Sequence, residues 1–201
     1  MSDGRQCVGR PVLGYFPKQL FPPPDRLRAR GIEEIASVSL CMSEGPEGWH
    51  EAWKHNAWGF FANPEVAWSL VPSHQRQDYW VYAYALYPVE YWNGREKPLD
   101  VDAPEVMPLG PEFELVGLDV VSRSAGVYFE CSPLSCNMLA EEIATNRYCL
   151  FSELNDAREL ARSADDIGCE PGPYHVLEVW RKHGKGKGHH APQPSQPMHR
   201  P

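Results

Sequence analysis

The sequence predicts an α+β fold in which two strand–helix–strand–helix–strand pseudo-repeats share one mixed or antiparallel sheet. Apolar residues alternate along several short stretches, as they do in strands, and segments with helical spacing separate these stretches. The second half also resembles the first when the sequence is shifted by 90 residues. With 201 residues, of which 42% are hydrophobic, the chain is long enough to bury a substantial core.

Residues 1–34 are expected to form an N-terminal arm that lies across the body. The apolar residues at 12–16 predict a short strand. The prolines at 22–24 favour an extended chain, because proline fixes φ and restricts the residue before it. We therefore expect no independent folding unit in this arm.

The first pseudo-repeat is predicted over residues 35–92. Its clearest helix start is Asn63, whose side chain can accept a hydrogen bond from a free backbone N–H. Pro64 suits the first helical position, and Glu65 suits the positive end of the helix. Pro88 is expected to end regular strand pairing or to mark an edge. The expected elements are strands over 35–42, 58–61 and 79–87 and helices that begin near Trp49 and Asn63.

A connector is expected over residues 93–112, because that segment is rich in proline, glycine and charge and has no period. The second pseudo-repeat is predicted over residues 113–181. Residues 182–201 are predicted to be a disordered basic tail, because they contain almost no apolar side chains to bury. The expected elements of the second repeat are strands over 113–122, 146–151 and 173–180, a short helix after residue 137, and a longer helix over 153–164.

The repeat is predicted from identities that recur at the shift of 90 residues. An alternative is that two unrelated strand–helix–strand units look alike because their periods are alike. If the repeat holds, residues shared by both halves serve the fold, and residues found in one half only are free to serve function. The identical pairs are Glu51 and Glu141, Asn56 and Asn146, Phe61 and Phe151, Ala67 and Ala157, and Leu70 and Leu160.

The charge of the chain is unevenly distributed. The formal net charge is -8, but the segment from Arg181 onward carries five basic residues and no acid, which leaves -13 on residues 1–180. An acidic body repels phosphate groups, so we expect neither a nucleic acid nor a membrane as partner. A protein partner or a small cationic ligand is expected instead. The alternative is that the acidity only keeps the protein soluble.

The sequence predicts a cytoplasmic protein with reduced thiols. No apolar stretch reaches the ~18 residues of a membrane span, and the N-terminus lacks the apolar core of a signal peptide. Cysteines are then expected to stay reduced. Their spacing matches no common zinc pattern, so no metal and no other cofactor is expected. The six cysteines are Cys7, Cys41, Cys131, Cys136, Cys149 and Cys169.

The candidate functional surface is the loop over residues 122–137, which has no counterpart in the first half. It combines a cation, an acid, two thiols, several hydroxyls and an amide before a predicted helix. That helix start would offer free N–H groups to an anion, with its first turn capped by a side chain of the loop. The alternative is an ordered loop with buried thiols. The candidate binding residues are Arg123, Glu130, Cys131, Ser135, Cys136 and Asn137.

Two further features have alternative interpretations. A loop thiol near a helix start would have a lowered pKa and would act as a nucleophile if a base were beside it. The candidate bases are His50, His55, His74 and His175. Six of the seven tryptophans lie between Trp49 and Trp92. Packing in the core is expected for them, and an aromatic platform for sugars or cations is the alternative.

The segments GFFANPEVAWSLVP (59–72) and YWVYAYAL (79–86) loosely resemble part of the ADP-ribosyltransferase fold, in which a small helix follows an aromatic strand. The chain shows no arginine strand and no Ser-Thr-Ser strand of that family, so the resemblance implies a shape only. The predicted function is a non-catalytic binding module, such as an inhibitor, immunity-type protein or adaptor. The alternative is a small transferase or hydrolase with its site at the 122–137 loop, and the question of enzymatic activity stays open.

Overall fold

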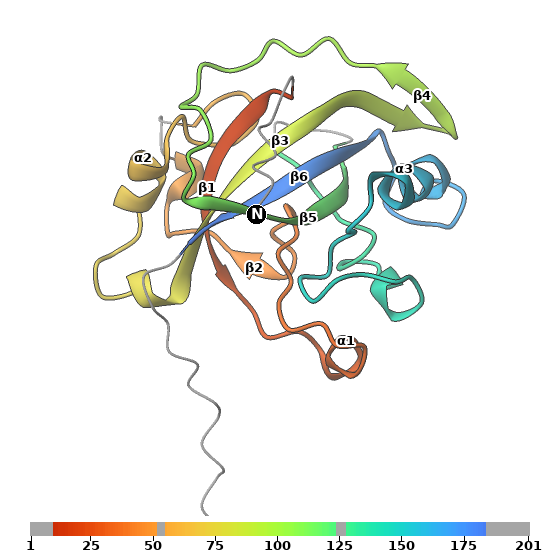
Figure 1. Cartoon of the computed structure of the whole chain (residues 1–201), viewed down its shortest axis with the longest axis horizontal. Helices are drawn as coiled ribbons and strands as arrows, with labels where there is room; N and C mark the ends of the chain where they lie inside the picture. The colour runs from red at the N-terminus through yellow and green to blue at the C-terminus, as the bar shows by residue number, and fades with distance from the viewer. Residues whose placement is uncertain (1–9, 52–54, 124–127, 184–201) are drawn as a thin grey trace, which may run out of the picture.

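The computed structural model describes residues 10–51, 55–123 and 128–183. Its centre is an antiparallel sheet with the strand order β2-β1-β3-β6-β5, and β4 pairs with the outer part of β3 (Figure 1). The predicted α+β class with an antiparallel sheet is therefore confirmed. The strands are β1 (Val12–Leu20), β2 (Ser43–Glu44), β3 (Tyr79–Trp92), β4 (Arg95–Pro98), β5 (Phe113–Ser122) and β6 (Tyr174–Lys182).

The described part of the chain contains three short helices: α1 (Asp25–Ala29), α2 (Pro64–Ser69) and α3 (Leu154–Ser163). Helix α2 packs against β1 and β3, whereas α3 packs mainly against β5 and β6, so the two helices lie at opposite ends of the sheet (Figure 1). The predicted start of α2 is confirmed, because the Asn63 side chain accepts a hydrogen bond from the Val66 N–H at 2.8 Å. No helix in the described part of the chain is long and apolar enough to cross a membrane.

The expected N-terminal arm contains a strand of the sheet. Strand β1 lies between β2 and β3, and its Leu13 and Tyr15 side chains are fully buried. The expected connector over residues 93–112 likewise contains β4, while the rest of that segment packs on the body through the hydrogen bond from Tyr15 Oη to the Met107 carbonyl. Both segments therefore contribute directly to the sheet.

The strand predicted over residues 35–42 is wrong. This segment forms bends and turns, and only Ser43–Glu44 pairs with β1 as strand β2. The reason is that buried charged side chains take its backbone groups: Lys18 binds three of its carbonyls and Asp119 binds the Val38 N–H. Backbone groups held in this way cannot join a strand ladder.

Several predicted boundaries also differ from the structure. Strand β3 runs past Pro88, although its pairing with β6 shifts register between Leu86 and Glu90. The apolar runs at 58–61 and 146–151 form isolated bridges rather than strands: Phe61 bridges Tyr15 and His55, and Phe151 bridges Leu118. The segments predicted to be short helices near residues 49 and 139 are 3-10 turns, Trp49–Glu51 and Leu139–Glu141. Of the predicted tail, Lys182 ends β6, His183 follows it, and residues 184–201 lie outside the described part.

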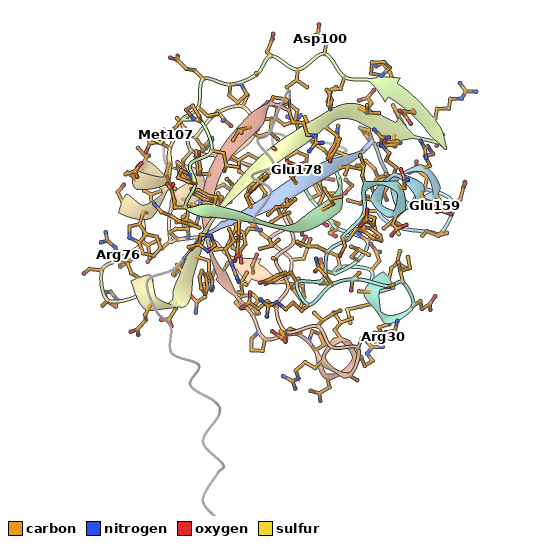
Figure 2. The ribbon with its side chains drawn as sticks, viewed as in Figure 1. Arg30, Arg76, Asp100, Met107, Glu159 and Glu178 are labelled. Carbon is orange, nitrogen blue, oxygen red and sulfur yellow. The ribbon has the colours of Figure 1, made fainter. Side chains whose placement is uncertain are left out.

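The two ends of the sheet have the same local pairing. Gly14 of β1 lies opposite Tyr84, Gly117 of β5 lies opposite Val179, and both glycines follow a register shift. Tyr84 and Val179 also lie opposite each other in the central pairing of β3 with β6. The middle of β6 holds a buried acid, Glu178 (Figure 2), which pairs with Arg10 and accepts hydrogen bonds from Tyr87 and Trp180.

Candidate functional site

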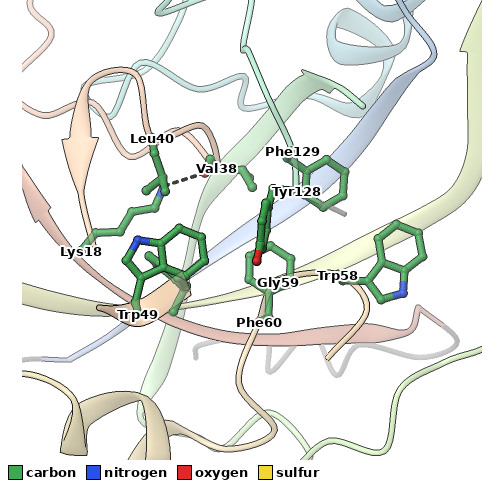
Figure 3. Close-up of a pocket in the computed structure, with 10 residues that line it drawn as sticks. Lys18, Val38, Leu40, Trp49, Trp58, Gly59, Phe60, Tyr128 and Phe129 are labelled. Carbon is green, nitrogen blue, oxygen red and sulfur yellow. Dashed lines mark hydrogen bonds between the residues drawn. The ribbon is translucent and has the colours of Figure 1, made fainter. Parts of the chain in front are cut away.

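An aromatic pocket opens beside β1, between the loop that precedes α2 and the loop that follows β5 (Figure 3). Its cavity volume is about 30 Å³. A cavity of this size admits a group of roughly two or three heavy atoms. We call this site the aromatic pocket. The residues that line it are Phe16, Lys18, Val38, Leu40, Trp49, Trp58, Gly59, Phe60, Tyr128 and Phe129.

The aromatic rings of the pocket contact one another in fixed geometries. Tyr128 meets Trp49 edge-on at 5.1 Å between ring centroids, and Phe129 stacks with Trp58 at 5.9 Å. Figure 3 shows Trp49 and Trp58 on opposite sides of Tyr128. A Cβ atom at Gly59 would lie 2.2 Å from the Tyr128 ring, so only glycine lets that ring approach the backbone here. Such contacts stabilise the walls of the pocket before any ligand binds.

Lys18 lies at the inner end of the pocket and is 1% exposed. Its Nζ donates to the carbonyls of Ser37, Val38 and Ser39 at 2.5, 2.7 and 3.0 Å. Burial lowers the pKa of Lys18 to about 7, and the charge of Asp119 opposes that shift. Three carbonyl acceptors match the three donors of an ammonium group, so this arrangement positions a cation and leaves no free lone pair for nucleophilic attack.

Asp119 of β5 lies on the other side of the same segment and is fully buried. Its carboxylate accepts hydrogen bonds from the Ser37 hydroxyl, the Val38 N–H and the Ser132 hydroxyl, each at 2.7 Å. Burial raises the pKa of Asp119, and these hydrogen bonds and Lys18 oppose the rise. The segment at residues 37–39 therefore connects a buried cation to a buried anion, which fixes one wall of the pocket.

Arg123, the predicted anion-binding residue, lies at the edge of the pocket. Its guanidinium carbon is 3.9 Å from the centroid of the Trp58 ring, and it donates a hydrogen bond of 3.4 Å to the Ala57 carbonyl. Burial lowers its pKa. Within the described part of the chain, Arg123 lies in no ion pair. A second cation thus lies beside the aromatic rings.

Two of the predicted thiols lie together with a third that the sequence did not indicate. The Sγ atoms of Cys41, Cys131 and Cys136 all lie within 4.8 Å of one another, and those of Cys41 and Cys131 are 3.6 Å apart. All three thiols are free. We call this group the thiol cluster. The sequence prediction of no metal rested on cysteine spacing, and spacing does not show that Cys41 lies beside Cys131 and Cys136 in the folded chain.

The three thiols have different acidities. Burial raises the pKa of Cys41, but hydrogen bonds from Ser39, Cys136 and Cys131 outweigh it, so that pKa lies below its ordinary value. Burial and the neighbouring thiols raise the pKa of Cys131, and burial raises that of Cys136. Of the three thiols, Cys41 therefore loses its proton most readily.

The other predicted site residues have structural contacts. The Glu130 carbonyl accepts a hydrogen bond of 2.7 Å from the Ser39 hydroxyl, and Ser135 is buried with its hydroxyl 3.8 Å from Cys136 Sγ. Asn137 is exposed and caps no helix, because Met138 occupies the cap position with φ 61°. The N–H groups of residues 139–141, which were expected to be free for an anion, bind the carbonyls of Pro133, Leu134 and Met138.

A cysteine nucleophile with a histidine base is not assembled in the described part of the chain. The thiols of the cluster contact one another, Ser39, Ser135 and the Glu130 carbonyl, and no histidine bonds to them. His55 contacts Tyr128 and Trp49 at the pocket instead. His175 is 3% exposed beside Phe129, and burial lowers its pKa to about 4.

Sequence reasoning missed Lys18, Asp119 and Cys41. A signal existed for the two charged residues, because each lies within a mostly apolar strand, VLGYFPKQL and FELVGLDVVS. A charge at such a position is usually paired when the strand is buried.

Comparison with known proteins finds no relative of this chain. No protein-family model matches the sequence, and neither a curated protein nor a solved structure is detectably similar to it.

Proposed function

We propose that the protein is a non-catalytic binding module that uses the aromatic pocket to hold an apolar anchor group of a protein partner. The observation that carries this proposal is the set of convergent rings, including Trp49, Trp58 and Tyr128, at one partly exposed site. Tryptophan and tyrosine contribute most of the free energy of binding in many protein interfaces. Their placement here supports recognition rather than packing alone.

The size of the pocket favours an anchor group over a free small molecule. Sites for small molecules usually enclose roughly 300–1,000 Å³, whereas this cavity measures about 30 Å³. So small a cavity buries only the tip of a ligand. The remaining free energy of binding must then come from the surrounding surface, as it does when a side chain of a larger partner inserts into a pocket.

The charges beside the pocket favour an uncharged or anionic group. The sequence suggested a cationic ligand because the body is acidic, but Lys18 lines the pocket and Arg123 stacks on Trp58 at its edge. Like charges in a half-buried site repel each other more strongly than they do in water. An apolar side chain, alone or next to a carboxylate, suits this site better than an ammonium group.

The proposal is tested by selecting peptides from a random display library against the full-length protein. Selected peptides are expected to share an apolar anchor and to bind Trp58→Ala and Tyr128→Ala at least about tenfold more weakly. Trp92→Ala is the matched control, because Trp92 is 55% exposed and does not line the pocket. If the selected peptides bind all three variants as they bind the wild type, the aromatic pocket is not the binding site.

We also propose that the two halves of the chain are pseudo-repeats related by an approximate two-fold axis at the Tyr84–Val179 pair. Three correspondences support this. Gly14 and Gly117 occupy the same place in β1 and β5, Phe61 and Phe151 form the same bridge to these strands, and Ala67 and Ala157 are both buried on helices. At the shift of 90 residues, the pocket-lining Trp49, Trp58 and Phe60 align with Leu139, Tyr148 and Leu150, so only Trp58 of these three has an aromatic counterpart.

A further inference from the structure

We propose that the thiol cluster of Cys41, Cys131 and Cys136 is a binding site for one thiophilic metal ion, with Zn²⁺ as the expected occupant. The geometry fits such an ion. Zinc binds thiolate sulfur at about 2.3 Å with tetrahedral geometry, which separates neighbouring sulfurs by about 3.8 Å. The Cys41 and Cys131 sulfurs are already 3.6 Å apart, and no pair in the cluster exceeds 4.8 Å.

The backbone around each thiol is held in place without a metal. Ser39 connects the two segments, because its hydroxyl accepts a hydrogen bond from the Cys41 N–H and donates one to the Glu130 carbonyl. Cys131 pairs with Ser122 at the end of β5, and the Cys136 N–H donates to the Ser132 carbonyl at 2.8 Å. A preorganised set of ligands lowers the entropy cost of metal binding.

The charges around the cluster also suit a metal–thiolate centre. Three thiolates and Zn²⁺ carry a net charge of -1, and the buried ammonium of Lys18 lies close enough to interact electrostatically with Cys41 and Cys136. A nearby cation stabilises thiolates and the complex that they form. Cys41 is exposed, so a water molecule can complete the fourth position, as in zinc sites with three protein ligands.

Occupation of the site would stiffen the aromatic pocket. Cys41 follows Val38 and Leu40 on one wall, and Cys131 follows Tyr128 and Phe129 on the other. A metal ion bound by both segments would cross-link these walls. Metal binding itself does not depend on the proposed pocket ligand, so a metal assay tests this inference separately from peptide binding.

The test uses the reduced full-length protein and Co²⁺, whose thiolate complexes absorb in the near ultraviolet and, when tetrahedral, in the visible. One equivalent of Co²⁺ is expected to bind with both absorptions, and Zn²⁺ is expected to displace it. Cys41→Ser, Cys131→Ser and Cys136→Ser should each weaken the near-ultraviolet band and lower Zn²⁺ affinity at least about tenfold. Cys169→Ser is the matched control and should bind as the wild type does. The histidines of the C-terminal segment cannot produce the thiolate band.

A second measurement on the wild type avoids any dependence on how the variants fold. Mass spectrometry after alkylation should show that Zn²⁺ protects Cys41, Cys131 and Cys136 and leaves Cys169 reactive. The inference is overturned if Zn²⁺ protects none of the three, if Cys41→Ser keeps the full thiolate band, or if the wild type takes up no metal and instead forms a disulfide between Cys41 and Cys131.

Discussion

Asn56 and Asn146 make the same set of hydrogen bonds, although they lie 90 residues apart in the sequence. Asn56 Nδ2 donates to the Leu13 carbonyl at 2.7 Å, and Asn146 Nδ2 donates to the Val116 carbonyl at 2.8 Å. Each Oδ1 accepts from the backbone N–H groups two and four residues later. Each side chain thus connects the loop before a helix to a strand of the sheet.

Replacing either asparagine by alanine should destabilise the protein to a similar extent. Asn56→Ala and Asn146→Ala each remove three hydrogen bonds from half-buried backbone groups. At about 1 kcal/mol for each bond, the free energy of unfolding should fall by about 3 kcal/mol. Urea denaturation of the two variants measures this. Asn137→Ala is the control, because Asn137 is exposed and caps no helix, and should change stability by less than about 0.5 kcal/mol.

Unequal effects of the two asparagines would count against the pseudo-repeats. If Asn56→Ala destabilised strongly and Asn146→Ala did not, the matching hydrogen bonds would be a coincidence of two unrelated loops. The sequence comparison predicted this pair because an asparagine that holds a turn is needed wherever that turn occurs. It could not predict which strands the side chains would reach, since that depends on the topology of the sheet.

Removing the buried cation should be costly. Lys18→Met leaves three buried carbonyls without their donor and removes the positive charge that acts on Asp119. An unsatisfied buried polar group costs about 1–3 kcal/mol, so the free energy of unfolding should fall by at least about 3 kcal/mol. Chemical denaturation checks the value. Lys97→Met is the matched control, because Lys97 is 75% exposed in its pair with Glu90 and should contribute no more than about 1 kcal/mol.

A double-mutant cycle shows whether Lys18 and Asp119 act together. Both contact the segment at residues 37–39, so Asp119→Asn should cost less when Lys18 is already methionine. The expected coupling energy is about 0.5–3 kcal/mol. Strictly additive effects would show that the two charges stabilise the fold independently.

Helix α2 could be predicted from the sequence because local interactions define its start. The structure of residues 35–42 could not be predicted, because it depends on residues far away in the sequence. Asn63 and Pro64 act locally, through their own backbone and the next turn. The alternation at 35–42 predicts that every second residue is buried, whereas residues 35–39 are all buried. It also does not show whether another strand or a buried charge satisfies the backbone. The same limit applies to the prediction of the candidate site. The loop that contains Cys131 and Cys136 was predicted from the sequence, but Cys41 lies beside that loop only in the folded chain.

Acid should destabilise the protein through His175. Burial, the charge of Arg123 and a weak opposing effect of Glu90 place its pKa at about 4 in the folded state, against 6.5 for an unperturbed histidine. Between these values the unfolded chain binds a proton that the folded chain does not, so the free energy of unfolding rises with pH across this window. Lowering the pH from 6.5 to 4 should cost up to about 3 kcal/mol from this residue.

The contribution of His175 is isolated by comparing variants at several pH values. His175→Leu should show a shallower fall in the free energy of unfolding from pH 6.5 to pH 4 than the wild type, because carboxylates contribute equally to both proteins. His74→Gln, at an exposed position, should keep the pH dependence of the wild type. An unchanged slope in His175→Leu would mean that His175 gains a proton in the folded state as readily as in the unfolded state.

The glycines of the two bulges should be the least replaceable in the sheet. Gly14 has φ +141°, and a Cβ atom there would lie 2.7 Å from both Phe60 Cβ and the Phe61 carbonyl oxygen; Gly117 has φ +152°, and its Cβ would lie 2.7 Å from Leu150 Cβ. Gly14→Ala and Gly117→Ala therefore combine backbone strain of about 1–2 kcal/mol with overpacking of about 1–3 kcal/mol. Gly31→Ala separates the two costs, because Gly31 has φ +84° with nothing within 4 Å, and should show the strain alone. Thermal and urea unfolding of the three variants test this. If all three lose the same free energy of unfolding, the close contacts of Phe60 and Leu150 with these glycines do not affect stability. The matching contacts would then give no support to the pseudo-repeats.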